Sequence, residues 1–195
     1  MISNRQRDPA LPKPPRLPTA PATAKAVAPP PSPVAATGAR RARLGDGIRS
    51  GTKFVPHPPS TIVVACADGR YTVNDADLLE ALKIPEPPDR QSPAGGPATY
   101  HALSCHRHAD RERGLNRLAF LVEHHATQRI ILVNHEDCAH YKSKFAQDTP
   151  ERRRQRQLDD LLEVRAELRR LHPAIRVDCY FARALEGYVT FFVVQ

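Results

Sequence analysis

The sequence contains no tryptophan, a single methionine and only four cysteines among 195 residues. No apolar run approaches the ~18 residues of a membrane-spanning helix, and none near the first residue would form the core of a signal peptide. The four cysteines are also too few and too far apart to hold a small disulfide-stabilised domain. We therefore expect a soluble, cytoplasmic protein whose cysteines serve as metal ligands, catalytic groups or small buried side chains.

Large apolar side chains are scarce in the first 50 residues, which hold ten of the twenty prolines. Such a segment cannot bury a core, so we predict a disordered tail over residues 1–55 and one folded domain over residues 56–195. Residues 1–50 carry nine Lys and Arg against two Asp, which is +7 of the net charge of +8. The remainder is nearly neutral and lacks basic residues mixed with aromatics, so we expect neither a nucleic-acid partner nor a membrane partner.

Short apolar runs alternate with helical patterns from about residue 55 onward. β-Branched residues and continuous apolar character predict buried strands, with two more strands near the end of the chain. The four predicted strands cover residues 60–68, 129–138, 175–182 and 188–194. This alternation predicts an α/β fold with a central, mostly parallel sheet and flanking helices. The last strand should be antiparallel, because only a short turn at Gly187 precedes it.

Three helices are predicted from the spacing of apolar residues. The first covers 74–84 with Asn74 or Asp75 as its cap, and the second covers 111–128. The third begins at Thr149 and Pro150 and runs to Leu171. We expect its leucines to face the core: Leu158, Leu161, Leu162, Leu168 and Leu171. Residues 85–100 are rich in turn formers and are interpreted as a loop.

Chemically reactive side chains follow two of the predicted strands. Cys66, Asp68 and Arg70 come at every second position after the first strand, and His135 and Cys138 end the second. Ligands bind at the carboxyl ends of strands in such folds, and a right-handed crossover could make these two strands neighbours. If the chain stays extended through Arg70, Asp68 lies on the same side as Cys66, with Arg70 beyond it.

A metal site would explain this combination. Either motif alone is a weak signal, since a cysteine after an apolar strand is usually a small buried side chain. Together, Cys66, His135 and Cys138 would form a Cys2His set of zinc ligands with the fourth position open, as in catalytic sites. Asp68 could then accept a hydrogen bond from a zinc-bound water, and Arg70 would keep that carboxylate ionised and fixed.

The motifs C-x-D-x-R and H-x-x-C resemble those of the β-class carbonic anhydrases, and the likeness extends over roughly residues 60–195. The resemblance implies one zinc ion per chain, bound by Cys66, His135 and Cys138, with Asp68 and Arg70 as the catalytic pair. The implied activity is that of a lyase, which hydrates carbon dioxide to bicarbonate by a zinc-bound hydroxide. The implied assembly is a homodimer or a higher even oligomer.

Several positions depart from the family pattern: Gly69 replaces a serine, Tyr71 a small apolar residue, and Ala139 a glycine. The sequence resembles a divergent branch of the family, and two alternatives stay open. The chain could bind zinc without turnover, in a regulatory or binding role, or it could hydrolyse a related molecule such as carbonyl sulfide or carbon disulfide. A redox role for Cys66 is less favoured, because no resolving cysteine lies nearby in sequence.

The histidines outside the two motifs offer proton relays, by virtue of a pKa near neutrality. His140 is preferred because it lies two residues after Cys138; the other candidates are His101, His106, His108, His124 and His125. A second metal site at Cys105, His106 and His108 is a further hypothesis. Surface histidines are the simpler interpretation in each case, and Cys179 is expected in the core.

Overall fold

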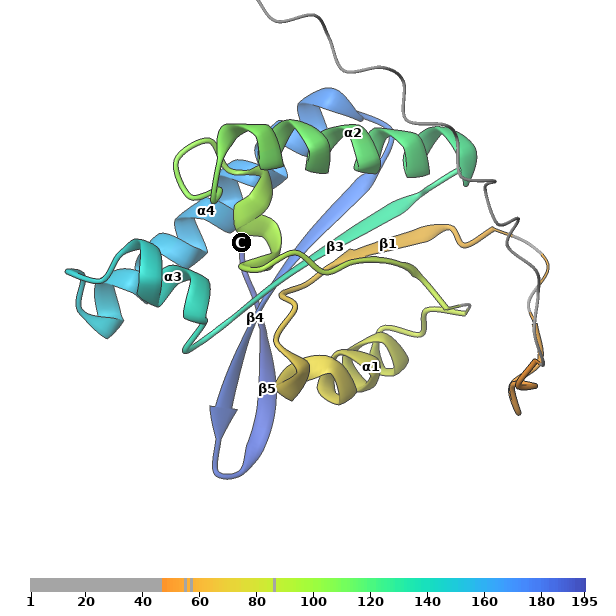
Figure 1. Ribbon diagram of the computed structural model, residues 1–195, viewed down its shortest axis with the longest axis horizontal. Coiled ribbons are helices and arrows are strands. Elements are labelled where there is room, and N and C mark those ends of the chain that lie inside the picture. Colours follow the sequence, from red (N-terminus) through yellow and green to blue (C-terminus); the bar gives the residue numbers. More distant parts are fainter. Residues whose placement is uncertain (1–46, 55, 57, 86) are drawn as a thin grey trace, which may run out of the picture. The chain divides into compact units, whose positions relative to one another are not determined.

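The computed structural model describes residues 47–54, 56, 58–85 and 87–195 (Figure 1). The chain divides into two units, residues 1–50 and 51–195. The predicted tail lies outside the described residues except for residues 47–54, which are exposed, and residue 56 begins the predicted domain. In the described part, no helix is both long and apolar enough to cross a membrane.

A five-stranded sheet forms the centre of the second unit, in the order β2-β1-β3-β4-β5. The strands are β1 (Thr61–Val64), β2 (Asp89–Gln91), β3 (Arg129–His135), β4 (Arg176–Leu185) and β5 (Tyr188–Val193). The first four are parallel, and β5 runs antiparallel to β4 after a turn at Gly187 with φ +84°. The predicted α/β class, mostly parallel sheet and antiparallel last strand are therefore confirmed.

Helices cover both faces of this sheet, with α1 on one side and α2 and α4 on the other (Figure 1). The α-helices are α1 (Thr72–Ala81), α2 (His108–His124), α3 (Ala139–Lys144) and α4 (Pro150–Leu171). Two short 3₁₀ turns, η1 (Gly69–Tyr71) and η2 (Gly96–Tyr100), connect them to the strands. Alternate residues of β1 and β3 face opposite layers, which is why the stretches Ile62–Val64 and Ile130–Val133 are continuously apolar.

The central pair β1 and β3 positions the candidate site. Val64 pairs with Leu132, so the carboxyl ends of both strands lie at the same edge of the sheet. Cys66 follows β1 by two residues, and His135 is the last residue of β3. The predicted adjacency of the two motif-bearing strands is thus confirmed.

Several predicted boundaries are wrong. β1 ends at Val64 rather than residue 68, and α1 begins at Thr72, so neither Asn74 nor Asp75 caps it. Asp75 is instead buried in the first turn of α1, 3.9 Å from Arg90. The loop predicted over 85–100 contains β2 and η2, and α3 was not predicted at all.

The start of α4 is as predicted. Thr149 is its N-cap, and its side-chain oxygen accepts a hydrogen bond from the Arg152 backbone N–H at 3.3 Å. Leu161 and Leu168 are buried in the core, and Leu158 and Leu162 are partly buried against it. Leu171 is 41% exposed, which contradicts its predicted inward position, because α4 ends there. Cys179 is in the core, as expected.

Candidate metal centre

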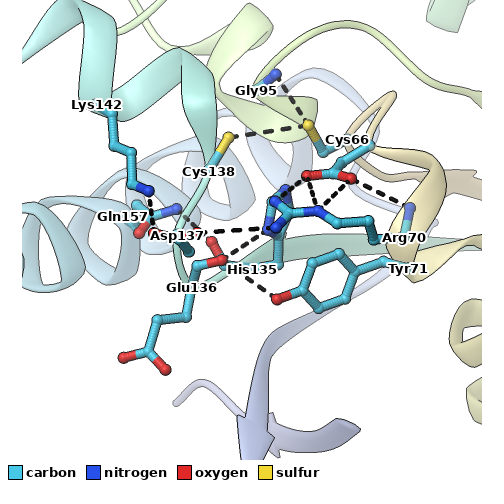
Figure 2. A network of polar contacts seen from close by, with 11 residues as sticks. Cys66, Arg70, Tyr71, Gly95, His135, Glu136, Asp137, Cys138, Lys142 and Gln157 are labelled. Atoms are coloured by element: carbon cyan, nitrogen blue, oxygen red, sulfur yellow. Dashed lines mark hydrogen bonds and ion pairs between the residues drawn. The ribbon is translucent and has the colours of Figure 1, made fainter.

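Cys66, His135 and Cys138 converge at the carboxyl edge of the sheet (Figure 2). Their Sγ and ring nitrogen atoms all lie within 4.8 Å of one another, and the two Sγ atoms are 3.8 Å apart. His135 and Cys138 are 3% and 2% exposed, and Cys66 is half-buried. Two sulfurs and one imidazole nitrogen at this spacing could hold a metal ion.

The ring of His135 is oriented by the backbone. Nδ1 lies 2.8 Å from the Glu136 carbonyl oxygen, which only accepts, so Nδ1 carries the proton and Nε2 a lone pair. Nε2 is buried and has no hydrogen-bond partner among the described residues. A buried acceptor without a donor is costly, and a histidine that donates through its other nitrogen is the usual form of a metal ligand. The residues present therefore fit a bound cation.

The two thiols share their protons unequally. A hydrogen bond from Cys138 lowers the pKa of the Cys66 thiol to about 4, although burial acts in the opposite direction. The same contact with Cys66, together with burial, raises the pKa of Cys138. The contact therefore shifts the pKa values of the two thiols in opposite directions. A cation bound between the sulfurs would favour thiolates on both, because a thiol ligates a metal in its deprotonated form.

Two glycines allow a loop to pack directly on Cys66. The Gly95 backbone N–H donates to Cys66 Sγ at 3.3 Å, and a Cβ on Gly95 would lie 2.6 Å from the ring of His140. A Cβ on Gly96 would lie 2.9 Å from the Cys66 backbone nitrogen. Both glycines have positive φ, +81° and +55°. The two glycines are visible in the sequence as part of PAGGPA, residues 93–98, but the sequence alone assigns them no role at the site.

Asp68 and Arg70 form a bidentate ion pair. The guanidinium donates to the carboxylate from Nε at 3.0 and 3.2 Å and from Nη2 at 2.6 Å, and the Arg70 backbone N–H donates at 3.1 Å. These hydrogen bonds lower the pKa of Asp68 to about 2. The predicted extended chain through Arg70 is wrong, because η1 begins at Gly69 with Asp68 as its cap. The turn folds Arg70 back onto the carboxylate.

The turn between β3 and α3 is held by contacts that the sequence analysis missed. The Glu136 carboxylate pairs with Arg154 and Arg183, and Gln157 Nε2 donates to the His135 carbonyl oxygen at 2.8 Å. Asp137 has a positive φ of 67° and pairs with Lys142. No local pattern could reveal these partners, since α4 and β4 supply three of them.

The proton-relay roles of the other histidines stay predictions, and their surroundings differ. His140 Nε2 lies 2.8 Å from the Ser104 carbonyl oxygen, and His101 is buried 2.8 Å from Glu163. His106 and His108 are exposed, while the nearby Cys105 is buried. Within the described ranges, one group of three or more His, Cys, Asp or Glu side chains could hold a metal, and it is Cys66, His135 and Cys138. The second metal site predicted at Cys105, His106 and His108 is therefore not supported.

No family model matches the chain, and no curated protein matches it. Solved structures do. A carbonic anhydrase from Glaciozyma antarctica is 17% identical, with a TM-score of 0.45, and the match covers 72% of this chain and 86% of that one. One from Streptococcus mutans is also 17% identical, with a TM-score of 0.46, over 74% and 88% of the two chains. A β-carbonic anhydrase from Trichomonas vaginalis is 18% identical, with a TM-score of 0.45, over 73% and 87%. Carbonic anhydrases are thus among the solved structures to which this chain is similar.

Proposed function

We propose that this chain binds one zinc ion through Cys66, His135 and Cys138 and hydrates carbon dioxide to bicarbonate. The observation that carries the proposal is the convergence of the three ligand atoms within 4.8 Å, with the lone pair of a buried His135 Nε2 unused. Two thiolates and an imidazole are a common ligand set for tetrahedral zinc, and three protein ligands leave the fourth position for reactants. The resemblance of the two sequence motifs to the β-class carbonic anhydrases supports the same reaction.

Zinc in such a site would supply a Lewis acid that lowers the pKa of a water molecule toward neutrality. Asp68 would hold that water. Its carboxylate stays ionised at neutral pH because Arg70 donates to both of its oxygens, so it can accept a hydrogen bond from the reacting water but cannot donate one. The Asp68 side chain is 17% exposed, which leaves little contact with bulk solvent.

Arg70 would act through Asp68. Its side chain is 63% exposed and also lies 3.8 Å from Asp137, in the turn before Cys138. The guanidinium thus connects the turn after β1 with the turn after β3. It would fix both the charge and the direction of the Asp68 carboxylate.

Stopped-flow measurement of carbon dioxide hydration between about pH 7 and pH 9 tests this proposal. The protein's zinc content is measured first, and Cys138→Ser serves as the variant without a complete ligand set. We expect rapid hydration by the wild type, with a rate that rises with pH as water loses its proton, and none above background by the variant. A zinc-loaded wild type that is inactive across this range would contradict the activity and leave the zinc site standing.

A zinc-binding protein without turnover is the second candidate. Tyr71 packs against His135 with ring centroids 4.3 Å apart, where the family pattern has a small apolar side chain. A bulky ring beside a ligand could restrict the access of substrate. Carbonyl sulfide and carbon disulfide, supplied to the same zinc-loaded protein, distinguish a changed substrate from a loss of turnover.

We also propose that the chain forms a homodimer or a higher even oligomer. A cavity of about 880 Å³ lies beside the short edge strand β2 and is lined by Arg90, Arg113 and Arg117, with the 55%-exposed Phe120. A second copy packed on this face would cover the exposed apolar ring of Phe120. Light scattering after gel filtration should give an even multiple of 21.7 kDa, and a monomer's mass would contradict the assembly. The four free cysteines suit a reducing, cytoplasmic compartment.

A further inference from the structure

The aromatic ring of Tyr71 is in contact with the proposed ligand His135. The two ring centroids lie 4.3 Å apart, and the ring planes are inclined by 35°. Figure 2 shows the tyrosine ring lying beside the imidazole, with its hydroxyl directed toward the turn that follows β3. This contact joins residues 64 positions apart in the sequence.

The hydroxyl of Tyr71 and the imidazole of His135 bind the same acceptor. Tyr71 Oη donates to the Glu136 carbonyl oxygen at 3.3 Å, and His135 Nδ1 donates to that oxygen at 2.8 Å. A carbonyl oxygen has two lone pairs, so it can accept both hydrogen bonds. Tyr71 thus restrains the imidazole twice, through its face and through the acceptor that fixes its tautomer.

Tyr71 is itself held in place by the ion pair next to it. It is the last residue of η1, whose first turn is capped by the Asp68 carboxylate, and its backbone N–H donates to the Asp68 carbonyl oxygen at 3.1 Å. The Arg70 guanidinium lies 6.0 Å from the centre of its ring. A tyrosine fixed in this way can restrain a neighbouring side chain.

We propose that Tyr71 is a positioning residue that keeps His135 Nε2 directed at the sulfurs of Cys66 and Cys138. The inference rests on the proposed zinc centre, although it does not depend on which reaction the centre performs. Partners that orient a metal-binding histidine typically contribute a factor of about 10–100 in metal affinity. Tyr71 should contribute in the same way, since it contacts both the ring and its acceptor.

Two variants separate the ring contact from the hydrogen bond. Tyr71→Ala removes both, and Tyr71→Phe removes the hydroxyl alone. Tyr188→Ala is the matched control, because Tyr188 lies on β5 and is 79% exposed. Zinc affinity is measured by competition with a chelator, and the visible absorption of the cobalt(II)-substituted protein reports the geometry at the metal.

We expect Tyr71→Ala to weaken zinc binding about 10–100-fold and to shift the cobalt absorption bands. Tyr71→Phe should weaken binding about fivefold, as for the loss of one hydrogen bond of typical strength. Tyr188→Ala should match the wild type. Unchanged affinity and an unchanged cobalt spectrum in Tyr71→Ala would overturn the role of Tyr71 alone. If that variant does not fold, the same result in Tyr71→Phe would overturn it. A wild type that binds no zinc would overturn the zinc centre and this inference with it.

Discussion

The Sγ atoms of Cys66 and Cys138 lie 3.8 Å apart, although 72 positions separate the two residues. No cysteine near Cys66 in sequence could form a disulfide with it, but the fold brings Cys138 close enough to do so. We expect the zinc-free protein, treated with the thiol oxidant diamide, to form a Cys66–Cys138 disulfide as each thiol loses a hydrogen to the oxidant. Peptide mass mapping without reduction detects this bond. Bound zinc should protect both thiols, and equal oxidation of zinc-loaded and zinc-free protein would contradict their role as ligands.

Metal content tests the three ligands directly. We expect about one zinc per chain in the wild type, and Cys66→Ser, His135→Ala or Cys138→Ser should each remove most of it, because two ligands seldom retain the ion. Cys179→Ser is the control, since Cys179 is buried in the core, away from the cluster. Elemental analysis after dialysis measures the result. Full retention of zinc in both single cysteine variants of the cluster would rule out the assignment.

Asp68→Asn separates metal binding from turnover. The amide has nearly the same shape as the carboxylate but carries no charge, and one of its two polar atoms only donates. We expect the variant to retain zinc and to lose carbon dioxide hydration by a factor of about 10²–10⁴, the range for a positioned acid or base. Glu112→Gln, on an exposed position of α2, controls for the loss of one negative charge. Turnover equal to that of the wild type would remove Asp68 from the mechanism.

The same carboxylate should affect stability in acid. Hydrogen bonds from Arg70 lower the pKa of Asp68 from an ordinary 3.8 to about 2, so the folded chain binds this proton less readily than the unfolded chain does. The contribution to stability is therefore present above about pH 4 and is lost as the pH falls toward 2. Urea unfolding of wild type and Asp68→Asn should differ most near neutral pH, with a difference that shrinks below pH 4. A difference that does not depend on pH would contradict the ion pair.

The sequence predicted the parts of the fold that depend on local pattern. The strands at 60–68 and 129–138 could be recognised because their apolar residues are continuous, and Thr149-Pro150 marked the start of α4 with a cap and a suitable first residue. The two motifs could be placed together because both follow parallel strands. The convergence of Cys66, His135 and Cys138 could thus be predicted from the sequence.

The missed elements depend on distant contacts. The residues of β2, Asp89–Gln91, are all polar, and the strand exists because its backbone pairs with β1 at the edge of the sheet. The six residues of α3 are too few to show a helical period. Tyr71 stands out as a departure from the family pattern, but its contact with His135 joins the end of η1 to the end of β3. Such contacts leave no trace in the spacing of residues along the chain.

A buried hydrogen bond connects α3, which follows the turn that carries Cys138, with α4. Tyr141 in α3 is 1% exposed, and its hydroxyl donates to Asp160 Oδ2 at 2.6 Å in the interior of the protein. Tyr141→Phe keeps the ring but leaves the buried carboxylate without this donor, which should cost about 1–3 kcal/mol in the free energy of unfolding. Asp160→Asn should cost less, because its amide oxygen can still accept from Tyr141. Urea titration measures both changes in the free energy of unfolding, provided that its dependence on urea concentration has the same slope in each variant as in the wild type. Tyr188→Phe, at an exposed position, should stay within about 0.5 kcal/mol of the wild type. If Tyr141→Phe is as stable as this control, the hydroxyl does not support the turn that carries Cys138.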